Sequence, residues 1–221
     1  LGASALVLAL VLAALTTGLA TAGRLRLSPV LAGAGGGALI ASAAATALAF
    51  AALIYAFAVS DFSVSNVALN SHTDKPMLYK VAAAWGSHEG SLVLWCLVMT
   101  AFGGALALAR GLPFGLKTSG VAVQGALSTL FLAFAVFTSN PFARLDPAPV
   151  QGASLNPLLQ DPALAFHPPL LYAGYVGFSV CFSLAVAALI EKRVDPAWGR
   201  WVRPWALASW AFLTVGITLG S

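Results

Sequence analysis

Residues 30–59 read VLAGAGGGALIASAAATALAFAALIYAFAV and contain no charged side chain. A helix needs about 20 apolar residues to cross the hydrocarbon core of a bilayer, so this stretch is long enough to span a membrane. Five further stretches have the same character, and we therefore expect an all-α fold, a polytopic membrane helix bundle that occupies residues 1–221. The six predicted spans are Ala5–Ala22, Val30–Val59, Val81–Ala109, Val121–Phe137, Pro169–Ile190 and Pro204–Ser221.

The composition supports the same class. The chain of 221 residues is 60% hydrophobic and only 8% charged, whereas a soluble domain carries about 25% charged residues. Most of the surface must therefore face lipid. The formal net charge is +4, but the chain contains no nucleic-acid-binding motif, and we expect no nucleic-acid partner. Cys96 and Cys181 lie singly in apolar runs, without CxxC or CxxCH spacing, which argues against a disulfide framework, a zinc site and a c-type haem.

The distribution of basic residues predicts the orientation in the membrane. Eight of the eleven Lys and Arg residues lie in the first, third and fifth connections between the predicted spans. The positive-inside rule places these connections in the cytoplasm. The second connection, about residues 60–80, and the fourth, about residues 138–168, then lie on the outer face together with the amino terminus. Long ordered loops usually carry function, so we expect any site on this face.

His167 stands before two prolines in the sequence AFHPP at positions 165–169. The residue before a proline is pushed away from the helical conformation, and proline is favoured in the first turn of a helix, so we expect His167 at or just before the outer end of the fifth span. The helix dipole disfavours a protonated ring there, and a neutral imidazole is well suited to bind a metal or haem iron. The alternative is an ordinary interfacial histidine. His72 lies in an exposed polar stretch and is given no role.

A second motif, WGSHEGS at positions 85–91, opens the third predicted span. Its His88 and Glu89 are ionisable groups at the membrane boundary, where such groups are costly and often functional. The motif does not match a zincin, because Leu92 stands where the second histidine would be. The alternative is a boundary pair that hydrogen-bonds inside the bundle and caps the helix.

Five segments carry a resemblance to a known family. They are the stretch from SDF at 60–62 to NS at 70–71, LYKVAAAWGSHEGS at 78–91, FTSNPF at 137–142, NPLLQDPALAFHPPLLYAGY at 156–175, and the stretch from RPW at 203–205 to LGS at 219–221. Together they resemble the amino-terminal part of the CcmF family of cytochrome c-type biogenesis proteins, a haem lyase subunit. The run at 156–175 is the longest and most specific of the five, and WGSHEGS supports it.

The resemblance implies a function for the complete protein. It would receive haem from a membrane-tethered haem chaperone and attach it through thioether bonds to the CxxCH cysteines of apocytochrome c, on the periplasmic side of the bacterial inner membrane. His167 would be an axial ligand of the haem iron, and Trp85, His88 and Glu89 are further candidates for the same cofactor site. The resemblance also implies a haem b held by later histidines, and other membrane subunits of cytochrome c maturation as partners. No catalytic acid or base is identifiable.

The family's tryptophan-rich motif and its second outer histidine have no counterpart in this sequence, so we expect the chain to be the amino-terminal part of a longer protein. Two other functions remain open from the residues. A transporter would show paired repeats with broken helices, and no repeat is visible here. In a non-catalytic scaffold subunit of a membrane complex, every residue singled out above would be structural.

Overall fold

The computed structural model describes residues 1–153, 161–194 and 196–220, and within them helices dominate. In chain order the helices are α1 (Gly2–Leu25), α2 (Pro29–Ala58), α3 (Ser65–Asn70), α4 (Met77–Gly86), α5 (His88–Leu108), α6 (Phe114–Phe137), α7 (Pro162–Gly177), α8 (Ser179–Ile190) and α9 (Pro196–Leu219). Six segments are long and apolar enough to cross a membrane, namely α1, α2, α5, α6, α9 and the nearly continuous α7 and α8. The predicted helical class and number of spans are therefore confirmed.

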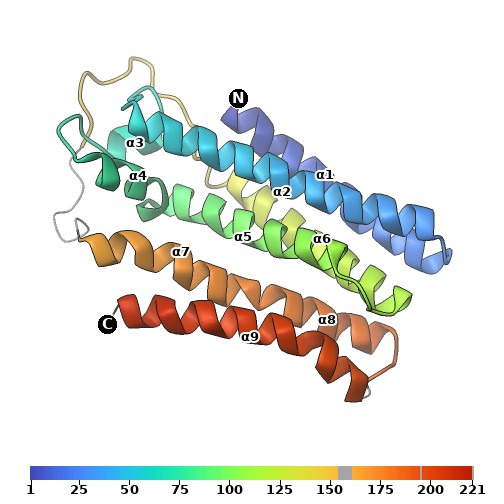
Figure 1. Ribbon diagram of the computed structural model, residues 1–221. Coiled ribbons are helices and arrows are strands. Elements are labelled where there is room, and N and C mark those ends of the chain that lie inside the picture. Colours follow the sequence, from blue (N-terminus) through green and yellow to red (C-terminus); the bar gives the residue numbers. More distant parts are fainter. Residues whose placement is uncertain (154–160, 195, 221) are drawn as a thin grey trace.

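The long helices run along one common axis (Figure 1). Helix α1 packs against α2 and α6, α2 packs against α5, and α9 packs against α7. The short helices α3 and α4 and the two long connections gather at one end of the bundle, which we call the loop end. The opposite end carries the short connections, and we call it the basic end.

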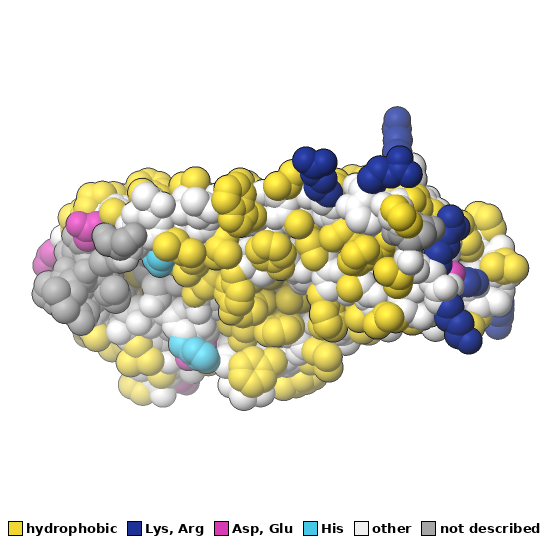
Figure 2. All heavy atoms as spheres, turned by 90° about the horizontal axis from the view of Figure 1, so that it is seen from below, with side chains coloured by type: hydrophobic (Ala, Val, Ile, Leu, Met, Phe, Trp, Pro, Cys, Tyr) yellow, Lys and Arg dark blue, Asp and Glu magenta, His cyan; other side chains and the backbone are white. Residues whose placement is uncertain are grey.

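Charge separates along this axis. In the view of Figure 2, most of the Lys and Arg side chains cluster at the basic end, hydrophobic side chains cover the middle, and the histidines lie toward the loop end. This pattern is typical of a membrane protein whose middle faces lipid. It agrees with the alternation of basic and polar connections along the sequence.

Helix α9 lies at the periphery and is held through close backbone contact with α7. Among its residues only Ser209 and Gly216 are buried. A Cβ atom on Gly216 would lie 2.7 Å from the backbone nitrogen of Leu171 in α7. A glycine is therefore required where the two backbones meet, as is common between membrane helices.

Gln124 connects three helices in the interior. Its amide nitrogen donates to the carbonyl oxygen of Met99 in α5 (3.0 Å) and to the Ser179 hydroxyl in α8 (2.9 Å). Its amide oxygen accepts from the Ser183 hydroxyl (2.7 Å), and the side chain is fully buried. Because a buried amide without partners is costly, these three bonds fix the relative position of α5, α6 and α8.

At the basic end, Glu191 joins α8 to α1 and α6. Its carboxylate accepts two hydrogen bonds of 2.6 Å from the Arg24 guanidinium and a third of 2.8 Å from the Ser119 hydroxyl. The hydrogen bond from Arg24 is the main reason why the pKa of Glu191 lies below its ordinary value, and the Ser119 bond adds to it. Paired, two-point contacts of this kind are the stronger ion pairs in proteins.

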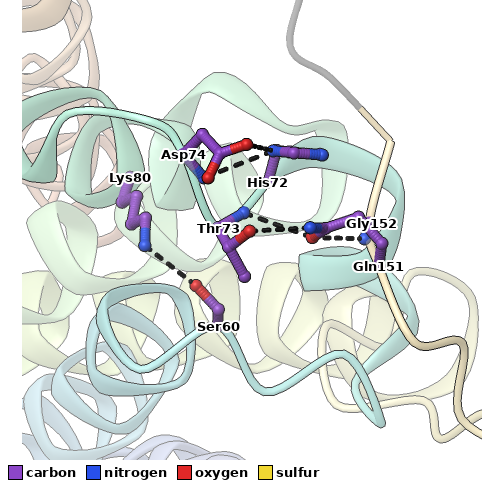
Figure 3. Close-up of polar contacts among 7 residues, drawn as sticks. All are labelled: Ser60, His72, Thr73, Asp74, Lys80, Gln151 and Gly152. Carbon is purple, nitrogen blue, oxygen red and sulfur yellow. Dashed lines mark hydrogen bonds and ion pairs between the residues drawn. The ribbon is translucent and has the colours of Figure 1, made fainter.

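The loop end is ordered by contacts between the two long connections. Residues Val64 and Arg144 form an isolated antiparallel bridge, and the Arg144 side chain pairs with Asp61 at 3.3 Å. Figure 3 shows that Gln151 exchanges hydrogen bonds with Thr73: its side-chain oxygen accepts from the Thr73 backbone nitrogen (3.2 Å), and its nitrogen donates to the Thr73 hydroxyl (2.6 Å). We call residues 60–76 together with 138–153 the loop cap.

The loop cap also anchors α4 and buries a lysine. Lys80 of α4 donates to the Ser60 hydroxyl at the end of α2 (3.1 Å), and His72 pairs with Asp74 (3.4 Å), as Figure 3 shows. Lys75 is buried and donates to the carbonyl oxygen of Asn70 (2.7 Å). Burial lowers the pKa of Lys75 to about 8, because the charged form loses its hydration.

Several predicted span boundaries differ from the helix ends in the structure. The third span was expected to run unbroken over Val81–Ala109, but the helix breaks at Ser87, whose extended backbone ends α4 and whose side chain caps α5. The last span begins at Pro196 rather than Pro204, because proline is tolerated inside a membrane helix when neighbours satisfy the freed backbone groups. The fourth begins at Phe114 rather than Val121. Residues 156–160 of the motif at 156–175, and Ser221 of the last predicted span, lie outside the described residues.

Candidate functional site

A cleft of about 320 Å³ opens at the loop end, between α4, the start of α5 and the start of α7. Its lining includes Trp85, Ser87, His88, His167, Pro168 and Tyr172. Three of the four candidate residues, Trp85, His88 and His167, are thus brought together although they lie far apart in the sequence. A larger groove of about 420 Å³ between α2, α5 and α6 is lined mainly by small and aliphatic residues and has no histidine in its lining. Three of the candidate residues predicted from the sequence thus line the smaller cleft.

The start of α7 corrects the expectation for His167. The structure places His167 inside the helix, not before it, because α7 already begins at Pro162. Asp161 caps this earlier start: its carboxylate accepts from the backbone nitrogen of Ala163 (2.7 Å). An aspartate at the cap followed by proline at the first helical position is a strong start signal, and it outweighs the preference of residues before proline for extended backbone. His167 consequently lies in the second turn of α7.

The two prolines inside α7 leave backbone carbonyl groups without their usual donors. Pro169 has no N–H to donate to the carbonyl oxygen of Ala165, four residues earlier. The indole N–H of Trp85 donates to this oxygen instead, at 2.9 Å. The WGSHEGS motif is therefore hydrogen-bonded directly to the AFHPP motif.

The imidazole of His167 is oriented by α9. Its Nδ1 lies 2.7 Å from the carbonyl oxygen of Gly216. Because a carbonyl oxygen only accepts, Nδ1 carries a hydrogen, and in the neutral ring the lone pair is then on Nε2. A histidine whose Nδ1–H donates to a backbone carbonyl while Nε2 stays available is the arrangement seen in metal-binding histidines. The ring also packs directly on Gly220, where a Cβ atom would overlap it.

The turn between α4 and α5 places His88 in the same cleft. The Ser87 hydroxyl accepts from the backbone nitrogen of Gly90 (3.1 Å) and so caps α5. Gly90 lies against the carbonyl oxygen of Ala84, where a Cβ atom would clash, and this close approach lets the chain reverse. His88 is exposed, and its Nε2 lies 3.4 Å from the Ser139 hydroxyl of the loop cap.

Glu89 is not among the residues that line the cleft. It lies in the first turn of α5, where a negative charge is stabilised by the helix dipole. This position supports the capping alternative for Glu89.

Sequence reasoning missed several residues that complete the cleft. Tyr172 lines it, about one turn beyond Pro168, and its ring contacts Trp95 of α5 with centroids 6.0 Å apart. Gly216 in α9 and Gly220, which follows the last residue of α9, contact the histidine ring. The four-residue helical spacing of Tyr172 from Pro168 was a usable signal, whereas no local pattern links residues 216–220 to residue 167.

The fold and cleft define an α-helical membrane protein with an oriented imidazole at its loop end. The chain belongs to the family described as Cytochrome C assembly protein, whose model matches residues 85–221. This match begins at Trp85 and covers every helix from α5 onward.

The relatives found by comparison are cytochrome biogenesis proteins. The chain is 64% identical to the cytochrome c-type biogenesis protein ccl1 of Rhodobacter capsulatus, over 79% of this chain and 27% of that protein. It is 54% identical to CycK of Rhizobium meliloti, over 100% of this chain and 33% of CycK. Against CcmF of Escherichia coli the identity is 53%, over 78% of this chain and 27% of CcmF. The chain thus spans about a third or less of the length of these relatives.

A solved structure described as Cytochrome c Heme Lyase CcmF has the same fold. The TM-score is 0.83 at 28% sequence identity, and the match covers 98% of this chain and 34% of the solved chain. The helical arrangement described above is therefore shared with that protein.

Proposed function

We propose that this chain forms part of a membrane haem lyase of cytochrome c maturation, and that His167 binds the iron of the incoming haem through Nε2. The observation that carries the proposal is the 2.7 Å contact between His167 Nδ1 and the Gly216 carbonyl oxygen. It fixes the tautomer and the direction of the ring before any ligand arrives. The names of the relatives, cytochrome c-type biogenesis proteins and a haem lyase, support the same assignment.

The cleft suits one face of a haem. Its lining includes the imidazole of His167, the aromatic side chains of Trp85 and Tyr172, and the polar side chains of Ser87 and His88. Apolar and aromatic walls with a few placed polar groups are typical of cofactor sites. When bound, the haem would supply the vinyl groups that react. The residues of this chain would bind the iron, orient the ring and hold it at the membrane surface.

The product would be a c-type cytochrome. Thioether bonds would form between the haem vinyl groups and the two CxxCH cysteines of the apocytochrome. The proposed partners are therefore an apocytochrome c, a membrane-tethered haem chaperone and other membrane subunits of the maturation system. The loop end would face the periplasm and the basic end the cytoplasm, as the positive-inside rule requires. A haem b bound by residues outside this chain completes the proposed cofactor set.

The test is covalent haem in a reporter c-type cytochrome, in cells whose only copy of the full-length protein carries His167→Ala. We expect maturation to be lost while the protein remains in the membrane, and we expect added imidazole to restore it by replacing the missing ligand. His72→Ala is the matched control, because His72 lies in the loop cap and does not line the cleft. Normal maturation with His167→Ala would contradict the proposal and favour the scaffold alternative.

A further inference from the structure

We propose that Trp85 is a positioning residue for His167: its indole N–H replaces the backbone donor that Pro169 lacks, and so holds the first turns of α7 in place against α4. The proposal rests on the function proposed above, since it concerns the histidine assigned there as the iron ligand. It assigns Trp85 a role that acts through the protein, in addition to its place in the wall of the cleft.

The carbonyl oxygen of Ala165 needs a donor. Ala165 is buried, at 2% exposure, and a buried carbonyl without a hydrogen bond is costly. In an unbroken helix the amide of residue 169 would supply the bond, but residue 169 is proline. Trp85 supplies it at 2.9 Å from another helix. Proline is tolerated in membrane helices through substitute bonds of this kind.

The hydrogen bond from Trp85 joins α4, which is held against α2, to the stretch of α7 that carries His167. Trp85 packs against Phe50 of α2, with ring centroids 6.3 Å apart, and α4 is tied to the end of α2 by the bond from Lys80 to Ser60. His167 lies between Ala165 and Pro169 in the same stretch of helix. The indole of Trp85 therefore fixes the helical turn that carries His167 relative to α4.

Trp95 provides a control for Trp85, because it packs against α7 and, in the part of the chain that the structure describes, donates no hydrogen bond to it. Trp95 also faces α7, with its ring 4.7 Å from Tyr175 and 6.0 Å from Tyr172. Its indole nitrogen is buried and, among the described residues, has no hydrogen-bond partner. Trp95→Phe therefore makes the same chemical change as Trp85→Phe without removing a hydrogen bond.

The experiment measures covalent haem in the reporter cytochrome with full-length protein that carries Trp85→Phe, Trp95→Phe, Pro169→Ala, or Trp85→Phe together with Pro169→Ala. Each variant is measured with and without imidazole, and its level in the membrane is recorded. We expect Trp85→Phe to lower maturation about ten-fold, the effect of one lost hydrogen bond to a buried group. We expect the double variant, Trp85→Phe with Pro169→Ala, to show maturation within about two-fold of the wild type. In this variant the backbone N–H of residue 169 donates to the carbonyl oxygen of Ala165. Imidazole should also restore maturation with Trp85→Phe, and the other two single variants should resemble the wild type.

Wild-type maturation with Trp85→Phe would overturn the inference. So would a loss that Pro169→Ala does not rescue, since this would mean that Trp85 acts through the size of its ring. If Trp85→Phe fails to accumulate, the double variant must restore accumulation as well, and its failure to do so counts against the bond. A normal result with His167→Ala would instead contradict the proposed function, so the two failures are distinguishable.

Discussion

Replacement of Gly220 by alanine should displace the imidazole of His167 and lower haem attachment, while the histidine itself is unchanged. An ideal Cβ atom on Gly220 would lie 2.5 Å from Nδ1 of His167 and 3.1 Å from Nε2. Ordinary contact distances are about 3.5 Å or more, so the ring must move by roughly 1 Å. Such a move breaks the 2.7 Å bond to Gly216 that orients the ring. Overpacking of this kind costs about 1–3 kcal/mol, and a 1 Å misplacement of a functional group can lower a rate about 100-fold.

The assay is again covalent haem in a reporter cytochrome, normalised to the amount of protein in the membrane. We expect Gly220→Ala to lower maturation by between ten-fold and 100-fold. Gly199→Ala, within α9, is the control, because nothing lies within 4 Å of its added Cβ atom. Equal maturation in both variants would refute the reasoning, since it would show that the ring position is not fixed by this contact.

Three further predictions concern the framework around the site. Glu191→Gln should destabilise the protein by about 1–2 kcal/mol in thermal unfolding, at the low end for an ion pair because the Arg24 side chain is 32% exposed. Since the pKa of Glu191 is lowered, the advantage of the wild type over this variant should be complete above about pH 4.3 and decline as the pH falls below it; an advantage that does not change with pH would count against the ion pair. Gln124→Leu should cost about 1–2 kcal/mol, because α6 loses its hydrogen bonds to α5 and α8, and an unchanged melting temperature would contradict this. The pKa of Lys75 is lowered to about 8, so the unfolded loop cap binds more protons between about pH 8 and pH 10.4, and its protection from hydrogen exchange should rise over that range. Lys75→Met should abolish this rise, and a rise that persists in the variant would exclude Lys75 as its source.

The membrane spans were predictable because insertion into a bilayer depends on the hydropathy of about 20 consecutive residues, which is a local property of the sequence. The break at Ser87 was not predicted, because the apolar residues before it (81–86) and after it (92–109) were joined into one span across residues 87–91. Its signal was the cap chemistry of serine followed by Glu89 and Gly90. The early start of α7 likewise depended on local cap chemistry, an aspartate at the cap followed by Pro162 at the first helical position.

The candidate site was predictable in part. His167 and the WGSHEGS motif stand out by their chemistry at a membrane boundary, and the structure brings Trp85, His88 and His167 into one cleft. The contacts that orient His167 were not predictable. The bond to Gly216 and the bond from Trp85 to Ala165 join segments that are 49 and 80 residues apart. Such pairs leave no periodic trace in one sequence.

The central claim is that Nε2 of His167 binds haem iron in the cleft at the loop end. The most direct measurement compares the absorption spectra of haem bound to purified full-length wild-type protein and to the His167→Ala variant. Our account predicts a difference spectrum of histidine-ligated haem, which disappears when imidazole is added to the variant. Identical spectra and identical haem content in the two proteins would contradict it.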